Sequence, residues 1–183
     1  MKEIRFAAWL SLPAALLFLP GARAQGPGTL VQEARFTWTT VRGNLIKMAD
    51  KMPEEYYGYR PVAEIETFAQ RLAHIAGANL GVCTGLLTNS VRPMGRVTGS
   101  TKAELVAALA ESATACDKAF EATTDKNAFE MVSSRLGGPF PPEPTRSRLS
   151  TLTNMIRHSN EMYGYMCVYL RLKGIVPPSS APE

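Results

Sequence analysis

The sequence predicts an all-α fold, a four-helix bundle, and three observations lead to this prediction. Apolar residues recur at spacings of three and four in four separate stretches. Loops rich in Gly, Pro and Ser divide these stretches, and no alternating apolar–polar pattern of useful length predicts a strand. We expect a signal peptide at residues 1–24, the bundle at 25–174, and an extended C-terminal tail at 175–183.

The N-terminal segment has the features of a signal peptide. Lys2 and Arg5 form a charged start, an apolar run follows at 6–19, and the sequence ARA at 22–24 has the small-x-small pattern of a cleavage site. The apolar run is shorter than the ~20 residues that a membrane-spanning helix needs. We therefore expect cleavage after Ala24, and a periplasmic or secreted chain that has no membrane attachment.

The mature chain would contain 159 residues (183 − 24), which suits one domain with a single core. Removal of Lys2, Arg5, Arg23 and Glu3 leaves 17 basic and 15 acidic residues, a net charge of +2. No run of Lys and Arg is present, so nucleic acid is not an expected partner. A small-molecule ligand and a second copy of the chain are the partners that the sequence leaves open.

The first two helices are expected at residues 30–48 and 62–83. One side of each carries the repeating core positions: Leu30, Ala34, Trp38, Val41, Leu45 and Met48 in the first, and Ile65, Phe68, Leu72, Ile75, Asn79 and Val82 in the second. Pro53 ends the first helix, because proline cannot donate a backbone hydrogen bond.

The third helix is expected at 101–120 and the fourth at 146–173, with a short helical turn around 128–132 between them. Thr101 and Glu104 form a capping box at the start of the third helix, and Gly174 suits the end of the fourth. The expected core positions are Leu105, Leu109, Ala113, Cys116 and Phe120 in the third helix, and Leu152, Ile156, Ser159, Tyr163, Met166 and Leu170 in the fourth.

The connection between the second and third helices is about 18 residues long, which is long for a simple antiparallel turn. Such a loop could cross the ~30 Å length of a helix, so that the two helices run parallel. Cys83 and Cys116 would then lie at similar height and could form a disulfide, which an exported chain permits. The disulfide and the crossover support each other, although neither proves the other. Cys167 would be an unpaired, buried thiol.

Two histidines lie on the predicted helices. His74 is roughly opposite the main apolar side of the second helix, where the commoner interpretation is an exposed surface side chain. His158 lies beside the core positions of the fourth helix, in a row with Met162, Tyr165 and Tyr169. That row suits an aromatic packing seam with His158 at its edge.

All six tyrosines belong to two short segments, one before the second helix and one in the fourth helix. If the segments meet, their rings and hydroxyls would line one region near His158. Such a region suits a ligand pocket, and it suits equally a polar end of the bundle. The pocket candidates are Tyr56, Tyr59, Tyr163, Tyr165 and Tyr169.

The segments "KMPEEYYGYRPVAEIETFAQRLAHIAGANLGVC" at 51–83 and "HSNEMYGYMCVYLRLKGIVPPSS" at 158–180 resemble those of DinB-like proteins, especially exported bacterial members. The resemblance extends over about 30–180. It implies a four-helix bundle with an up-down-down-up arrangement, which agrees with the crossover between helices two and three.

The resemblance also implies a metal site made by one histidine of the second helix and an H-x-x-x-H pair of the fourth. His74 matches the first position and His158 the second, whereas Met162 stands in place of the third histidine. Nickel and zinc prefer imidazole to a thioether, so we expect at most weak binding of one divalent ion. Glu161 is the possible substitute ligand.

Three functions follow as hypotheses. The first is a metalloenzyme-like protein, because some DinB-like relatives are thiol-dependent transferases or isomerases. Such an activity suits an exported chain poorly, because the thiol cofactors of these enzymes are generally cytosolic. The chain could instead bind a small ligand without catalysis, in a cleft beside His158 and the tyrosines. It could also be a structural or interaction module that has lost its metal site. No reaction can be assigned from the sequence.

Overall fold

The computed structural model describes residues 28–89, 97, 99, 101–132 and 146–181, and the signal peptide expected at 1–24 lies outside this part. The described residues form four α-helices: α1 at Leu30–Lys51, α2 at Phe68–Thr88, α3 at Lys102–Glu121 and α4 at Arg148–Leu172. The predicted all-α bundle is confirmed. No helix among the described residues combines the length and the hydropathy needed to cross a membrane.

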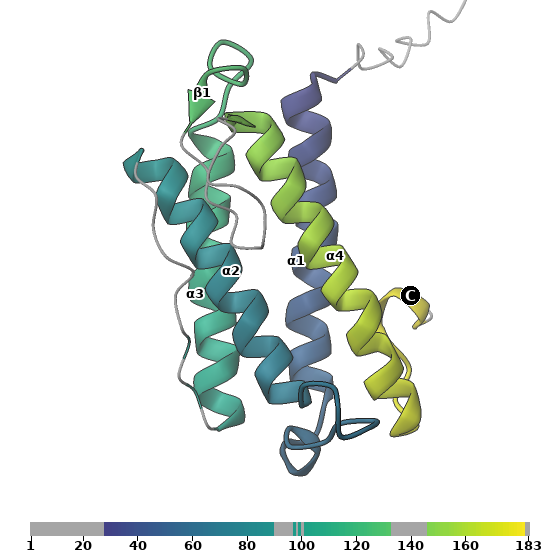
Figure 1. The fold of residues 1–183 in the computed structure, drawn as a ribbon. Coiled ribbons are helices and arrows are strands. Elements are labelled where there is room, and N and C mark those ends of the chain that lie inside the picture. Colours follow the sequence, from purple (N-terminus) through teal and green to yellow (C-terminus); the bar gives the residue numbers. More distant parts are fainter. Residues whose placement is uncertain (1–27, 90–96, 98, 100, 133–145, 182–183) are drawn as a thin grey trace, which may run out of the picture.

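The four helices pack in the cyclic order α1–α3–α2–α4, with α2 and α3 in the most extensive contact (Figure 1). Cys83 and Cys116, each near the C-terminal end of its helix, are joined by a disulfide, so α2 and α3 run parallel. His74 of α2 faces His158 of α4, and Arg148 at the start of α4 donates to the Leu86 carbonyl near the end of α2. These two helices are therefore antiparallel, as in the up-down-down-up arrangement.

Most expected core positions are buried. All five in α3 and all six in α4 lie below a tenth exposed, whereas Leu30 at the start of α1 is 62% exposed. Leu30 is the first residue of its helix and directly follows Thr29, the N-cap. Val31, the next residue, is buried instead, so the spacing of apolar residues identified the core but chose the wrong residue in the first turn of α1.

The second helix begins later than the sequence analysis predicted, at Phe68 instead of residue 62. Thr67 accepts from the backbone N–H of Gln70, and the Gln70 side chain accepts from the backbone N–H of Thr67. This capping box fixes the first turn of α2. The residues before it form turns and bends instead, and the helix continues to Thr88, five residues beyond its expected end.

The helical turn expected around 128–132 is also corrected. Turns occupy residues 125–129, and two short strands follow, β1 at Met131–Val132 and β2 at Arg146–Ser147. The strands pair antiparallel, with Val132 opposite Arg146. Ser147 then caps α4 through its side chain. The pairing of β1 with β2 thereby places Ser147 where α4 begins.

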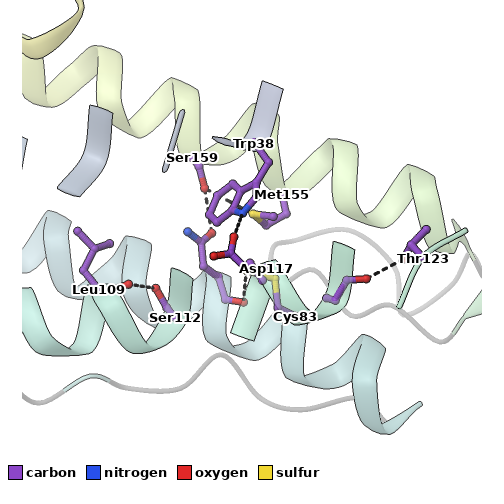
Figure 2. The surroundings of a disulfide bond; sticks show 11 residues. Trp38, Cys83, Leu109, Ser112, Asp117, Thr123, Met155 and Ser159 are labelled. Carbon is purple, nitrogen blue, oxygen red and sulfur yellow. Dashed lines mark hydrogen bonds between the residues drawn. A yellow bond between two sulfur atoms is a disulfide. The ribbon is translucent and has the colours of Figure 1, made fainter. Parts of the chain in front are cut away.

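Polar contacts tie α1 to α3 beside the disulfide (Figure 2). Trp38 Nε1 donates to Asp117 Oδ1 at 2.8 Å, and Arg42 forms an ion pair with the same carboxylate. Trp38 is 2% exposed, and its ring stacks on Phe120. The third cysteine, Cys167, is free, as expected, but half-buried instead of buried.

The C-terminal segment is more ordered than the extended tail that the sequence analysis predicted. Gly174 has a φ of +71°, a left-handed conformation that glycine adopts without strain, and the chain reverses there. Residues Pro178–Ser180 then form a 3-10 turn that contacts α1. Tyr163 donates to the Ser179 hydroxyl at 3.0 Å and accepts from the Ser179 backbone N–H. The segment is thus held against the bundle.

Candidate two-histidine site between α2 and α4

The two histidines converge between α2 and α4. His74 Nε2 and His158 Nε2 are 3.1 Å apart, within hydrogen-bonding distance, with the donor set by the ring tautomers. Their rings meet edge to face, with centroids 5.1 Å apart. Both side chains are half-buried. The alternative that His74 is an exposed surface residue is therefore wrong, since α2 buries a second side against α4.

Arg71 and Met162 occupy the next turn along the same interface. Arg71 lies three residues before His74, and Met162 lies four residues after His158, so each shares a helix face with its histidine. Arg71 Nη1 donates to Met162 Sδ at 3.5 Å, and the guanidinium carbon lies 5.4 Å from the centre of the Tyr165 ring. The position that the resemblance to DinB-like proteins assigns to a third histidine is thus held by a thioether that contacts a cation.

Glu161, the possible substitute ligand, is directed elsewhere. Its side chain is 40% exposed, Oε2 accepts from Arg157 Nη1 at 3.1 Å, and Oε1 accepts from the Tyr165 hydroxyl at 3.2 Å. Among the described residues, no group of three His, Cys, Asp or Glu side chains is arranged to hold a metal ion. The part of the chain that the structure describes therefore offers two nitrogen ligands at this site, and Glu161 does not add a carboxylate.

The tyrosines make several separate contacts. Tyr59 and Tyr169 meet edge to face, and Lys173 Nζ lies 3.7 Å from the centre of the Tyr59 ring and 4.7 Å from that of Tyr56. Tyr163 faces the C-terminal segment, as described above, and half-exposed Tyr165 covers Arg71. Within the described residues Tyr56, Tyr59 and Tyr169 gather at the end of the bundle, and Tyr165 lies over Arg71.

A shallow groove lies at the other end of the bundle, where α1 and α4 begin. It is lined by Leu30, Glu33, Ala34, Thr37, Phe129, Ser147, Leu149, Ser150 and Thr153. None of these residues belongs to the predicted site. The groove therefore gives no support to the cleft that we expected beside His158.

A buried polar pair joins α2 and α4 in the core, and its contact was not predicted from the sequence. Ser159 donates to Asn79 Oδ1 at 2.9 Å, and the two side chains are at most 1% exposed. Asn79 Nδ2 is buried and has no hydrogen-bond partner among the described residues. The sequence did contain an indication of this pair, since Asn79 and Ser159 are polar residues at predicted core positions that are otherwise mostly apolar.

Burial lowers the pKa of His158 below its ordinary value of about 6.5, and the neighbouring His74 lowers it further. Below pH 6.5 the folded chain then binds fewer protons than the unfolded chain. The free energy of unfolding should therefore decrease as the pH is lowered through that range. His158→Gln should lose less stability than the wild type between about pH 7.5 and about pH 5.5. Urea unfolding at both pH values measures this, and equal losses in the two proteins would contradict it.

The two histidine nitrogens supply part of the ligand set that a divalent ion needs. Two imidazole nitrogens that each lie about 2.1 Å from one zinc ion are about 3.4 Å apart at a tetrahedral angle, near the 3.1 Å between His74 Nε2 and His158 Nε2. Met162 does not complete the site, because a thioether binds zinc and nickel weakly and Arg71 adds a positive charge beside it. The residues suit two protein ligands, with water in the remaining positions.

Fold and site together define a class, the four-helix bundles in which histidines of the second and fourth helices converge. The family sequence model of the DinB superfamily matches residues 37–166, and the chain therefore belongs to this superfamily. A search of curated proteins returned no match.

Among solved structures, the chain is similar to a DinB-like protein from Bacillus cereus ATCC 10987, with a TM-score of 0.63 and 17% identity. The likeness covers 80% of this chain and 95% of that one. At this identity it supports the fold alone.

Proposed function

We propose that this DinB-superfamily protein is exported and binds one divalent ion, nickel or zinc, weakly through His74 and His158. The observation that carries the proposal is the 3.1 Å separation of the two Nε2 atoms. An ion bound there would act as a Lewis acid on water or on a polar group of a ligand. No reaction is part of the proposal.

Two observations support export. The segment at 1–24 has the charged start, apolar run and cleavage pattern of a signal peptide. Cys83 and Cys116 form a disulfide in the core, which persists in oxidising compartments and is rare in the cytosol. The periplasm or the extracellular space is therefore the compartment that we propose.

A second function, a binding or structural module without metal, is favoured by one observation. The Arg71 guanidinium donates to Met162 Sδ, so a positive charge lies beside the position that matches the third ligand of DinB-like proteins. This charge disfavours a dication nearby. The two functions differ in whether the purified protein takes up metal at all.

Loss of either histidine should abolish most metal binding, because one imidazole cannot hold an ion against water. We expect the tag-free mature chain to take up one equivalent of zinc or nickel in a calorimetric titration. His74→Ala and His158→Ala should each bind at least about tenfold more weakly, a change of ~1.4 kcal/mol.

Glu111→Gln is the control, since Glu111 is an exposed carboxylate on α3 and its loss should leave binding unchanged. Absence of uptake in the wild type at millimolar metal, or unchanged uptake in both histidine variants, would remove the metal function and leave the second one.

A further inference from the structure

Arg71 is a partly buried cation whose hydrogen-bonding groups are poorly satisfied. Its side chain is 19% exposed, and Nε is buried without a hydrogen-bond partner among the described residues. Nη1 donates to Met162 Sδ, and thioether sulfur is a weak acceptor. A guanidinium normally satisfies several donors when it is buried, so this one has capacity for a further acceptor.

A carboxylate of the chain lies beside the free edge of Arg71 without bonding to it. Glu66 Oε2 is 3.6 Å from Arg71 Nε, within ion-pair range but longer than a hydrogen bond. The Glu66 side chain is 47% exposed, so it can turn toward solvent at little cost. Its position shows that this edge of the guanidinium accepts a carboxylate, and that the present one is not held tightly.

The orientation of Arg71 suits a ligand that arrives from outside the bundle. Half-exposed Tyr165 covers one face of the guanidinium, so a ligand must approach its edge, where only the weakly held Glu66 and the thioether of Met162 lie. Arg71 and His74 lie three residues apart on one face of α2, about one helical turn from each other. A group held by Arg71 would therefore lie next to the pair formed by His74 and His158.

We propose that Arg71 binds the carboxylate group of a small ligand, which displaces Glu66 and places the rest of the ligand beside the two histidines. The planar fork of a guanidinium matches a carboxylate with two parallel hydrogen bonds. This inference rests on the proposed function, because it names the ligand class of the same site between α2 and α4. The displaced Glu66 acts as an internal competitor.

The test uses the full mature chain, labelled with nitrogen-15 and freed of metal with a chelator. Acetate is the probe, titrated at constant ionic strength while the Nε–Hε resonance of Arg71 is followed by NMR. We expect a saturable shift of that resonance, because its hydrogen gains an acceptor.

Variants identify the binding group, with backbone amides of α2 as the common readout. Arg71→Gln should weaken acetate binding about 10- to 100-fold, the range expected for losing a hydrogen bond to a charged group. Arg71→Lys should weaken it as well, since an ammonium lacks the planar fork. Arg60→Gln is the matched control on an exposed arginine and should leave binding unchanged. Glu66→Gln should strengthen it severalfold by removing the competitor.

Three results would overturn the inference. These are the absence of a saturable shift in the wild type, acetate affinity in Arg71→Gln equal to that of the wild type, or phosphate bound as tightly as acetate. The last would mean that the site recognises negative charge and not the planar carboxylate. Because the protein is free of metal, an acetate response without zinc uptake would contradict the proposed metal function alone. Zinc uptake without an acetate response would contradict this inference alone.

Discussion

Replacing Met162 with histidine is expected to raise the affinity for zinc or nickel on the order of 100-fold, about 2.8 kcal/mol. Met162 lies one turn after His158 on the same face of α4, and its side chain is buried at 7% exposure. An imidazole there would complete a set of three nitrogen ligands with His74 and His158. The Arg71–Met162 contact would be lost in the same step.

Arg71 is the obstacle to this gain, since its positive charge would remain close to the new ligand. The double variant Met162→His/Arg71→Gln should therefore bind metal at least as tightly as Met162→His alone. Calorimetric titration with zinc and nickel measures both. Met131→His is the control, because it adds a histidine at a position that is 60% exposed on β1, away from the pair. It should bind no more tightly than the wild type at the two-histidine site.

An unchanged affinity in both Met162→His and the double variant, where Arg71 no longer opposes the ion, would have one meaning in structural terms. It would show that His74 and His158 do not direct their Nε2 atoms to a point that a side chain at position 162 can reach. The 3.1 Å contact would then be a hydrogen-bonded pair and no part of a metal site. The prediction thus separates a reduced metal site from a packed pair of histidines.

The histidine pair shows where a helical wheel is informative and where it is not. His158 could be placed beside the core of α4 because the core positions around it are spaced regularly. His74 lay opposite the main apolar side of α2, and the wheel of one helix does not show that a second helix covers that side. The resemblance to DinB-like proteins supplied what periodicity lacked, because it matched both histidines to one site.

Other features of the site could not be predicted from spacing. Arg71 was missed, since a long flexible side chain can reach several neighbours and sequence does not choose among them. The two tyrosine segments meet at Tyr59 and Tyr169. Tyr163 and Tyr165 have different neighbours, because residues two apart on a helix point about 200° apart. The late start of α2 was readable, since Thr67 and Gln70 have the spacing of a capping box.

Removal of the Cys83–Cys116 disulfide is expected to lower the free energy of unfolding by about 3–4 kcal/mol. The bond closes a loop with a sequence separation of 33, and the chain-entropy model assigns such a loop ~3.8 kcal/mol. For a chain of this size, the melting temperature should fall by about 10 °C. Urea and thermal unfolding of Cys83→Ala/Cys116→Ala measure both, and Cys167→Ala, which removes the free thiol, is the control.

The same measurement bears on the compartment. Both sulfurs are fully buried at the α2–α3 contact, so the double variant also loses packing, and the reduced wild type separates the two effects. Reduced wild type should lose most of the stability that the variant loses, because the constraint on the unfolded chain is then absent. A chain kept in the cytosol would have this lower stability. Equal stability of the oxidised and reduced forms would contradict the prediction and would remove the disulfide as support for export.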